Sequence, residues 1–235
     1  MENTYDVAII GSGIAGTMLG AILAKEGVSV VIIDAGTHPR FAVGESMVPE
    51  SAVLLKILAN RYAIPELAYP GELNSLIKHV GSSSAGIKLA FSFAWNGKHQ
   101  EHNPLDVVST PVIAPEAHLF RQDVDAYYLA LAARLGATIK QQARIQDIEE
   151  TADGMILNLG REQLSARYVV DAAGYRSPIA DKYQLRQGAR EMQARTRSIF
   201  THMTGVKLYE EVIASTQASG SPTPLAQSTL HHMFK

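Results

Sequence analysis

Hydrophobic residues in the first part of the chain form two short continuous runs with a helically spaced stretch between them. The runs over 5–10 and 28–33 have the length and composition of buried strands, and the stretch that continues to Glu26 has the apolar pattern of a buried helix. The first run leads into Gly11-Ser12-Gly13-Ile14-Ala15-Gly16, and the second ends in Asp34. This order of strand, glycine-rich turn, helix and strand predicts the βαβ unit of a doubly wound α/β fold.

The rest of the chain predicts both helices and strands. Helical spacing is found over 50–62 and again from Asp123 to 135, where Gly136 ends the pattern. Alternating or continuous apolar patterns predict strands at 87–95, 107–113, 137–140, 168–171 and 198–208. Three shorter segments predict a small antiparallel meander at 145–150, 155–159 and 163–165. The Ser/Pro/Gly-rich stretch 215–224 is typical of a loop.

Composition excludes several classes of function. Twenty-one basic and 23 acidic residues give a net charge of −2, which does not suggest binding to nucleic acid or to an anionic membrane. The absence of cysteine excludes disulfides, thiolate metal sites and a cysteine nucleophile. No His/Asp/Glu cluster has metal-ligand spacing, and the adjacent His231-His232 would point to opposite faces of a strand, so we expect no metal site.

The segment 7–24 is apolar enough to imitate a membrane span or a signal sequence. Acidic residues at Glu2 and Asp6 precede it where a signal peptide carries positive charge, and glycines interrupt it. A buried strand followed by a buried helix explains the segment better. We therefore expect a soluble, cytoplasmic protein.

The glycine-rich turn has the pattern that binds the pyrophosphate of a dinucleotide. Gly11 permits a tight turn out of the strand, Gly13 lets the backbone approach a phosphate, and Gly16 lets the helix pack closely on the strand. The helix N-terminus at Ile14 and Ala15 offers unpaired N–H groups and partial positive charge. A lone motif of this kind is weak evidence, but here both flanking strands are present.

Asp34 stands where a carboxylate can accept hydrogen bonds from both ribose hydroxyls. Its charge disfavours a 2′-phosphate, so NADP is not the expected ligand. The insertion between about 36 and 120 is too long for a plain dinucleotide domain. It resembles the interrupted arrangement of FAD-binding flavoproteins.

Two further motifs resemble those of known flavoproteins. Asp171-Ala172-Ala173-Gly174-Tyr175-Arg176-Ser177-Pro178 resembles the second motif of FAD-dependent monooxygenases and their relatives, which implies that Asp171 and Gly174 shape the FAD site. Gly44-Glu45-Ser46-Met47-Val48-Pro49 resembles a segment of flavin-dependent halogenases that lies against the flavin. The resemblance implies flavin contacts for Gly44, Glu45 and Ser46.

Three more segments resemble the halogenase family. The strand 85–95 is similar to the one that carries the active-site lysine, which would be Lys88, projecting into the tunnel between flavin and substrate. The segment 120–125 is similar to the family's Arg-x-x-x-Asp, which places Arg121 near FAD. Residues 228–234 resemble the strand that leads into the family's Trp-x-Trp-x-Ile-Pro motif, which this chain does not contain.

The resemblance covers nearly the whole chain, but the chain covers only about the first half of such an enzyme. It implies a Rossmann-like FAD-binding fold in three layers, a parallel sheet with an antiparallel meander, and inserted substrate-domain segments. Residues 1–235 would be a truncated FAD-binding domain. About 60–120 and 190–235 would contribute to an incomplete substrate-binding subdomain.

The implied activity is halogenation of an aromatic or phenolic substrate, free or tethered to a carrier protein. A separate flavin reductase would supply reduced FAD, and O₂ and chloride or bromide would yield hypohalous acid. The acid would pass to Lys88, which either hydrogen-bonds it or forms a haloamine. An FAD-dependent monooxygenase or reductase of the same fold is the alternative activity, and an inert truncated FAD-binding remnant is a third interpretation. The chain contains no Gly-x-Ser-x-Gly elbow, so its sequence argues against a serine hydrolase.

The same residues also allow structural interpretations. Lys88 would point to solvent if Ile87, Leu89 and Phe91 faced a core, as lysines are mostly exposed. Glu45 and Ser46 could stabilise a turn, and Arg121 could cap or salt-bridge the helix that follows. Asp171 could be a strand-end acid held by backbone donors. The aromatic residues favour a core position over a substrate cage: Phe91, Phe93, Trp95, Tyr127 and Tyr128.

Overall fold

The computed structural model describes residues 4–82, 84–101, 103, 106–186, 199–207, 211 and 228–234. The chain divides into two compact units, and each is described by itself. The first unit comprises Met1–Ala42, Leu58–Leu67 and Arg121–Ser198. The second comprises Val43–Ile57, Ala68–Phe120 and Ile199–Lys235.

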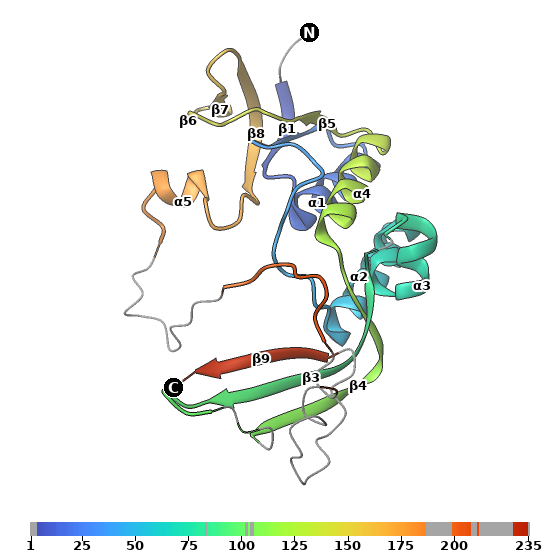
Figure 1. The fold of residues 1–235 in the computed structure, drawn as a ribbon. Helices are drawn as coiled ribbons and strands as arrows, with labels where there is room; N and C mark the ends of the chain where they lie inside the picture. The colour runs from blue at the N-terminus through green and yellow to red at the C-terminus, as the bar shows by residue number, and fades with distance from the viewer. Residues whose placement is uncertain are drawn as a thin grey trace. The chain divides into compact units, whose positions relative to one another are not determined.

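A six-stranded sheet forms the centre of the first unit, in the order β5-β2-β1-β8-β7-β6 (Figure 1). The strands are β1 (Thr4–Ile10), β2 (Val30–Ile33), β5 (Thr138–Lys140), β6 (Asp147–Thr151), β7 (Gly154–Asn158) and β8 (Gln163–Asp171). The first four in the sheet are parallel, with Ile9 in register with both Ile32 and Val170, and the last two are antiparallel. The predicted parallel sheet with an antiparallel meander is confirmed.

One predicted boundary within this sheet is wrong. The short strand expected at 163–165 and the core strand expected at 168–171 are a single strand, β8. Its first part, Gln163–Ala166, pairs antiparallel with β7, and Ser165–Asp171 pairs parallel with β1. No glycine or proline separates Ser165 from Tyr168, so nothing in the chain ends the first strand.

Two helices pack against each other beside the sheet: α1 (Ile14–Lys25) and α4 (Arg121–Arg134). A Cβ at Gly20 would lie 2.5 Å from Ile32, so α1 approaches the face that carries Ile9 and Ile32 closely. The opposite face carries a second cluster of buried residues, which are Ala8, Ile10, Val31, Ile33, Ile148, Leu157, Leu164 and Ala166. Helices, sheet and meander thus give the predicted layers, with the core on both faces of β1 and β2.

The predicted helices at 50–62 and 123–135 are confirmed as α2 (Pro49–Arg61) and as α4, which starts two residues before Asp123. The buried Tyr128 of α4 donates a hydrogen bond of 2.8 Å to the carbonyl of Leu67, and Tyr127 donates one of 3.2 Å to that of Glu66. Tyr128 is a core residue, as predicted. The shorter helical elements are η1 (Pro65–Gly71), α3 (Leu73–Ser75), η2 (Leu76–Val80) and α5 (Pro178–Lys182).

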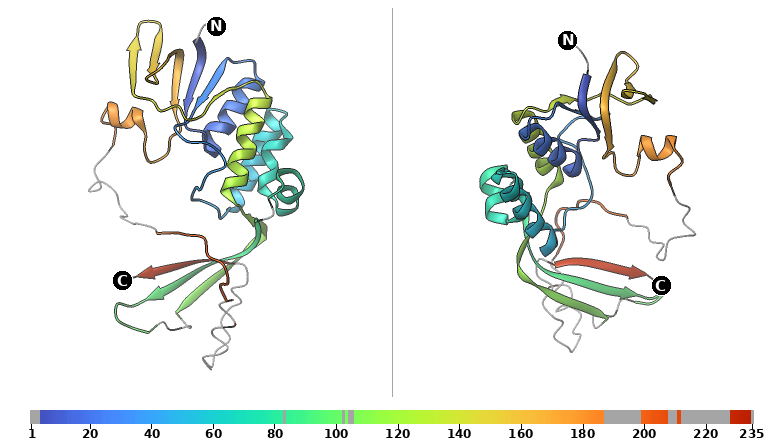
Figure 2. Two further views of the ribbon diagram at one scale, coloured as in Figure 1. Left: turned by 45° about the horizontal axis from the view of Figure 1, so that its top comes forward. Right: turned by 180° about the vertical axis from the view of Figure 1, so that it is seen from behind.

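The second unit contains a three-stranded sheet in the order β4-β3-β9, and Figure 2 shows the three strands side by side. β3 (Gly86–Asn96) pairs antiparallel with β4 (Val107–His118) and parallel with β9 (Ser228–Phe234). All three strands were predicted, and β4 runs five residues further than expected. The register shifts between Lys88 and Ala90, as in a β-bulge.

The buried face of β3 is the opposite of the expected one. Alternate residues Lys88, Ala90, Ser92 and Ala94 are buried, whereas Trp95 on the other face is 39% exposed. The expected aromatic core of Phe91, Phe93 and Trp95 is therefore wrong for this unit: these rings contact one another and His231 on the more open face. Small side chains occupy the buried face because they allow closer packing there.

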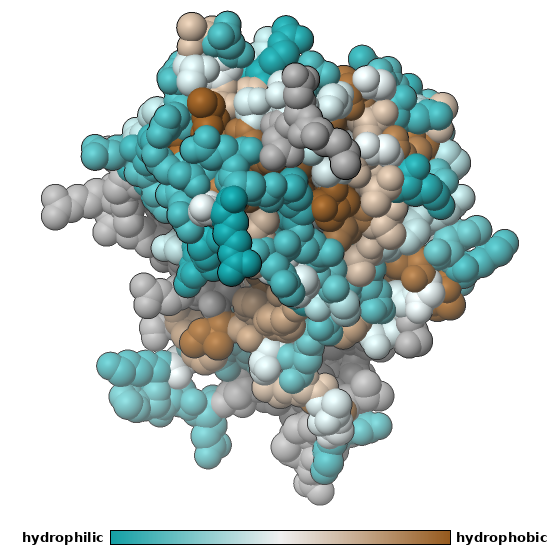
Figure 3. All heavy atoms as spheres, turned by 90° about the horizontal axis from the view of Figure 1, so that it is seen from above, coloured by the Kyte–Doolittle hydropathy of each residue, from teal (hydrophilic) through white to brown (hydrophobic). Residues whose placement is uncertain are grey.

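Another prediction that fails is the strand at 198–208. Its described part, 199–207, contains no strand, and Ile199 is 97% exposed. The loop expected at 215–224 lies outside the described residues. In the part of the chain that the structure describes, no helix has the length and apolar character needed to cross a membrane. Hydrophilic residues predominate on the face shown in Figure 3, where hydrophobic residues form separate patches.

Candidate functional site

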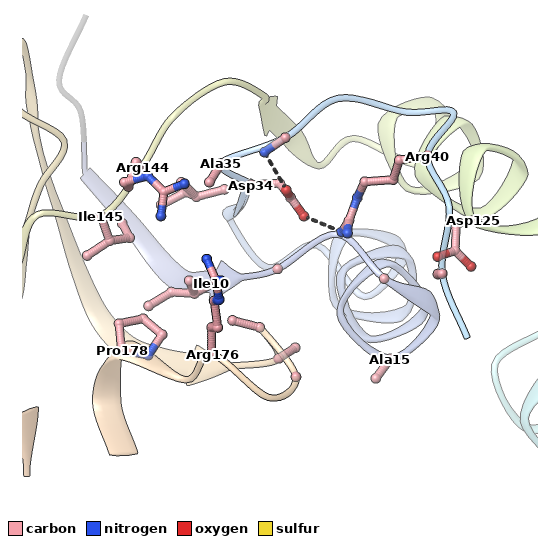
Figure 4. Close-up of a pocket in the computed structure, with 18 of the residues that line it drawn as sticks. Ile10, Ala15, Asp34, Ala35, Arg40, Asp125, Arg144, Ile145, Arg176 and Pro178 are labelled. Atoms are coloured by element: carbon pink, nitrogen blue, oxygen red, sulfur yellow. Dashed lines mark hydrogen bonds and ion pairs between the residues drawn. The ribbon is translucent and has the colours of Figure 1, made fainter. Parts of the chain in front are cut away.

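A cavity of about 1100 Å³ opens at the carboxyl ends of β1, β2 and β8 in the first unit. Its size reaches the upper end of the range for small-molecule sites, about 300–1,000 Å³. The end of a parallel sheet where the connections diverge is the usual ligand position in doubly wound folds. The lining residues include Gly11, Gly13, Ile14, Ala15, Asp34, Arg121 and Gly174, all of them predicted from sequence (Figure 4).

The glycine-rich turn has the geometry that its sequence predicted. Gly11 has a φ of +105°, and a Cβ there would lie 2.4 Å from the carbonyl oxygen of Ala172. A Cβ at Gly16 would lie 2.0 Å from the carbonyl oxygen of Gly11, so only glycine lets α1 start so close to the turn. Gly13 differs, because a Cβ there would meet nothing within 4 Å. The space beside Gly13 is the space a phosphate group needs.

Helix α1 begins at this turn without a side-chain cap. Gly13 is its N-cap residue and supplies no side-chain hydrogen bond. The first N–H groups of a helix have no partner within it, and the helix dipole adds partial positive charge there. Ile14 and Ala15 line the cavity at this point. The helix start is therefore suited to an anion such as a pyrophosphate.

Asp34 directly follows β2 and is held by four donors. Its Oδ2 accepts hydrogen bonds from the Ser12 N–H at 2.8 Å, the Ser12 hydroxyl at 2.7 Å and the Arg40 guanidinium at 2.8 Å. Its Oδ1 accepts one from the Gly36 N–H at 2.8 Å. A carboxylate offers about four acceptor positions, so the remaining capacity of Asp34 is mainly on Oδ1. That leaves room for one ribose hydroxyl more readily than for two.

The charge state of this group follows from its contacts. Burial alone would raise the pKa of Asp34, but the hydrogen bonds from Ser12 and Gly36 and the Arg40 cation outweigh it and hold this pKa below 3.8. His38, whose Nε2 lies 2.8 Å from the Ser12 hydroxyl, has its pKa lowered from 6.5 by burial and by Arg40. A neutral His38 thus donates to Ser12, which donates to the ionised Asp34. Ser12 is fully buried, which does not suit a nucleophile.

Four arginines line the cavity: Arg40, Arg121, Arg144 and Arg176. Arg121 makes a two-pronged ion pair with Asp125, at 2.7 and 2.9 Å, so it both salt-bridges its helix and lines the site. Figure 4 shows Arg144 and Arg176 on the side of the cavity near Pro178, away from Arg40 and Asp125. Neither has an ion pair among the described residues. This excess of positive charge favours an anionic ligand.

Two predicted cofactor residues of the first unit, Gly16 and Asp171, do not line the cavity. Gly16 acts through the close packing described above. The Asp171 carboxylate accepts from the N–H groups of Ala173 at 3.0 Å and Ile179 at 2.9 Å, and from the Ser177 hydroxyl at 2.6 Å. It therefore fixes the turn that carries Gly174, in agreement with the alternative interpretation of Asp171 as a strand-end acid held by backbone donors.

The other predicted residues, Gly44, Glu45, Ser46 and Lys88, belong to the second unit. The segment that begins at Gly44 lies along the end of β4. The Leu119 N–H donates a hydrogen bond to the carbonyl of Glu45 at 2.6 Å, and Ser46 forms an isolated antiparallel β-bridge with His118. The Ser46 and Thr229 hydroxyls are 2.6 Å apart, and the Glu45 carboxylate lies 2.7 Å from His202. Their flavin contacts stay predictions.

Lys88 is 1% exposed, so the alternative interpretation of Lys88 as a solvent-facing lysine is wrong. Its ammonium group lies 2.9 Å from Oε2 of Glu116, donates to the carbonyl of Met47 and lies 4.9 Å from the centre of the Phe91 ring. Met47 belongs to the segment 44–49. The structure thus brings two halogenase-like motifs, which are about 40 residues apart in sequence, to one ammonium group.

Sequence reasoning missed several residues of both groups. The roles of Ser12, His38 and Arg40 were not predicted, because they are evident only from the interactions around Asp34 in the structure. No role was predicted for Glu116, because its role depends on the β3–β4 register, in which it faces Lys88. A usable signal was an acidic residue in the apolar stretch 111–117, which continues beyond the predicted strand, because an unpaired buried charge is costly.

Residues 4–232 match the family of FAD binding domains. The chain belongs to this family. The FAD-binding domain described here is 38% identical to the monodechloroaminopyrrolnitrin halogenase PrnC of Pseudomonas fluorescens, over 100% of this chain and 41% of that protein. It is 37% identical to the tetracycline 7-halogenase of Kitasatospora aureofaciens, over 100% of this chain and 43% of that protein.

A solved structure agrees with this. The crystal structure of halogenase PltM in complex with phloroglucinol and FAD matches the domain with a TM-score of 0.86 and 44% identity, covering 98% of this chain and 46% of that one. The predicted resemblance to flavin-dependent halogenases is confirmed over the whole chain, and FAD is confirmed as the cofactor of the domain. The chain spans less than half the length of these relatives.

The cavity residues fit FAD. The helix start at Ile14 and the space beside Gly13 suit its pyrophosphate, and the free acceptor capacity of Asp34 suits its adenosine ribose. The arginines at both ends of the cavity would offset the negative charge of the FAD phosphates. Each of these features belongs to the first unit alone.

Proposed function

We propose that this chain is the FAD-binding part of a flavin-dependent halogenase that acts on a free aromatic or phenolic substrate. The burial of Lys88 beneath the carbonyl of Met47 carries the proposal, because it joins the two motifs that are specific to halogenases. The 37–44% identity to halogenases over nearly the whole chain supports it. FAD monooxygenases of the same fold share the cavity of the first unit but have no need of a buried lysine.

Bound reduced FAD would supply two of the four electrons that reduce O₂, and chloride or bromide supplies the other two as it is oxidised to hypohalous acid. The helix start at Ile14 holds the phosphates, and Asp34 with Arg40 orients the ribose. Lys88 receives the hypohalous acid and presents it to the aromatic ring. A shielded position strengthens the field of the lysine charge on the oxidant and protects the acid from water.

The partners follow from this chemistry. A separate flavin reductase would deliver reduced FAD, as the resemblance to flavin-dependent halogenases implies. A free phenol is favoured as substrate because PltM, at 44% identity, has been crystallised with phloroglucinol. The relatives named for a peptidyl-carrier-bound pyrrole share only 26–28% identity. We assign the second unit to the substrate-binding subdomain. A cytoplasmic location stays a prediction of the sequence.

The test is halogenation of phloroglucinol by the complete protein that contains this sequence. A flavin reductase, NADH, FAD, air and either chloride or bromide are supplied, and products are identified by mass spectrometry. A halogenated product from the wild type, lost in Lys88→Met while FAD still binds, is the expected result. Lys98→Met, in the exposed turn after β3, is the matched control and should retain activity.

Two other outcomes would overturn the proposed activity, and a third would overturn the proposed substrate alone. An oxygenated product that forms without halide would identify a monooxygenase. A protein that does not bind FAD would be an inert remnant. Product only from a carrier-bound substrate would refute the free phenol while leaving halogenation intact.

A further inference from the structure

Lys88 and Glu116 face each other directly across the β3–β4 ladder. Both side chains are buried, with 1% and 4% exposure, and the ammonium nitrogen lies 2.9 Å from Oε2. The sequence alone predicted no role for Glu116. It is the single charged side chain in contact with Lys88 among the described residues.

The surroundings of the pair are mostly uncharged. The segment 44–49 contributes the Met47 carbonyl, and β3 itself contributes the Phe91 ring. The other titratable groups beside the pair are His118, two positions further along β4, and His231 of β9, whose ring centre lies 4.5 Å from that of Phe91. Glu45 is engaged with His202. The charge that faces Lys88 is therefore that of Glu116.

The carboxylate of Glu116 is unusually dependent on this one contact. Neither of its oxygens receives a hydrogen bond of good geometry in the described part of the structure, although both are buried. A buried carboxylate without donors is unfavourable unless a cation lies beside it, and a buried ammonium is unfavourable without an anion. Each charge thus compensates the other. Such pairs add little net stability compared with an apolar pair, which favours a functional reason for this one.

We propose that Glu116 is a positioning residue that keeps the proton on Lys88 and holds its ammonium group in place. The proposal rests on the proposed function and deepens it: Lys88 acts as a charged hydrogen-bond donor and not as a free amine that forms a haloamine. The arene and the hypohalous acid then react as Ar–H + HOX → Ar–X + H₂O. The C–X bond forms as the O–X bond breaks, the departing hydroxide takes a proton from Lys88, and the proton released by the ring carbon balances it.

The first test measures the charge of Lys88 without flavin or halide. The rate at which an acylating reagent labels Lys88 in the complete protein is followed against pH by peptide mass spectrometry. In Glu116→Gln, the midpoint of labelling should fall by about one to three pH units, the usual effect of an adjacent opposite charge. Glu72→Gln, which breaks the exposed pair of Glu72 with Lys56, is the matched control and should leave the midpoint of Lys88 unchanged.

The second test measures catalysis with phloroglucinol. In Glu116→Gln, kcat should fall by about ten-fold or more while KM changes by less than about two-fold, because the substrate still binds but the ammonium is misplaced. Glu116→Asp, which restores the charge, should recover part of kcat. If Glu116 had only a structural role, its replacement would leave the labelling midpoint of Lys88 unchanged and would not lower kcat selectively over KM.

The outcomes separate the two proposals. A wild type that does not halogenate refutes the proposed function, while the labelling midpoint still reports on Glu116. A halogenating protein whose midpoint and kcat are unaffected by Glu116→Gln refutes the role of Glu116 alone, as does a haloamine on wild-type Lys88. If Glu116→Gln does not fold, Glu116→Asp gives a smaller shift of the midpoint in the same direction, and no shift there overturns the proposal.

Discussion

The guanidinium of Arg40 lies 2.8 Å from the carboxylate of Asp34, at the edge of the cavity. This ion pair compensates the charge that Asp34 presents to the cavity, and it occupies one of the positions at which the carboxylate accepts hydrogen bonds. The acid at the end of the second strand is thus part of a charge-balanced group with Ser12 and His38. Its contribution to FAD binding depends on that group as a whole.

We expect Asp34→Asn to weaken FAD binding by about ten-fold or more, since each 1.4 kcal/mol of lost interaction is a factor of ten. The amide keeps the size of the carboxylate but loses the charge that orders Ser12 and Arg40. Titration of the protein with FAD, followed by flavin fluorescence, measures the change. Asp153→Asn, in the exposed turn between β6 and β7, is the control. Equal affinities of both variants for FAD would remove Asp34 from the site.

His38 should make the stability of the protein depend on pH. Burial and Arg40 lower the pKa of His38 from 6.5, so the folded state binds the proton less tightly than the unfolded chain. The stabilisation is complete above pH 6.5 and is lost as the pH falls through the lower, folded-state pKa. Asp34, with its pKa below 3.8, acts with the same sign at more acidic pH.

The measurement is urea unfolding at about pH 7 and about pH 5. The free energy of unfolding of the wild type should fall more between these values than that of His38→Gln, where the titrating group is gone. His99→Gln, in the exposed turn after β3, should behave like the wild type. A His38→Gln variant with the full acid sensitivity of the wild type would contradict the assignment.

The sequence predicted the first unit better than the second, for a physical reason. The βαβ unit is encoded locally, by glycines at positions where a Cβ would collide and by strands whose apolar runs are buried on both faces. Two parallel neighbours of β1 and the meander followed from the same local patterns.

The failure in the second unit depends on contacts between distant residues. The buried face of β3 was assigned to its aromatic residues, because alternation cannot tell which of two faces is covered. The burial of Lys88 needed Glu116 opposite it in the register.

Gly13 and Gly16 should respond differently to the same substitution. A Cβ at Gly16 would lie 2.0 Å from the carbonyl of Gly11, so Gly16→Ala should prevent α1 from packing and leave little folded protein. Gly13→Ala meets open space at a negative φ and should fold, with a loss of stability of about 1 kcal/mol or less at the N-cap. It should nevertheless bind FAD about ten-fold more weakly or worse, since the methyl group enters the space for the pyrophosphate. Thermal unfolding and flavin fluorescence separate the two effects.

The buried pair predicts how stability should respond to single and double substitutions. Lys88→Met removes the only charged partner of Glu116 among the described residues and leaves a buried carboxylate without compensation, at a cost of about 3–5 kcal/mol. Adding Glu116→Leu removes that charge, and apolar replacement of a buried ion pair is often neutral or stabilising. The double variant should therefore regain most of the stability lost in Lys88→Met, as measured by urea unfolding.

This rescue distinguishes an ion pair kept for function from one kept for folding. If the pair serves halogenation, the double variant Lys88→Met/Glu116→Leu is as stable as the wild type and binds FAD, but makes no halogenated product. If the pair is needed for folding, the double variant stays as unstable as Lys88→Met. The exposed pair of Lys56 and Glu72 provides the comparison: with both side chains 53% exposed, its removal should change the free energy of unfolding by about 1 kcal/mol or less. An equal loss from both pairs would mean that the burial of Lys88 and Glu116 has no special energetic consequence.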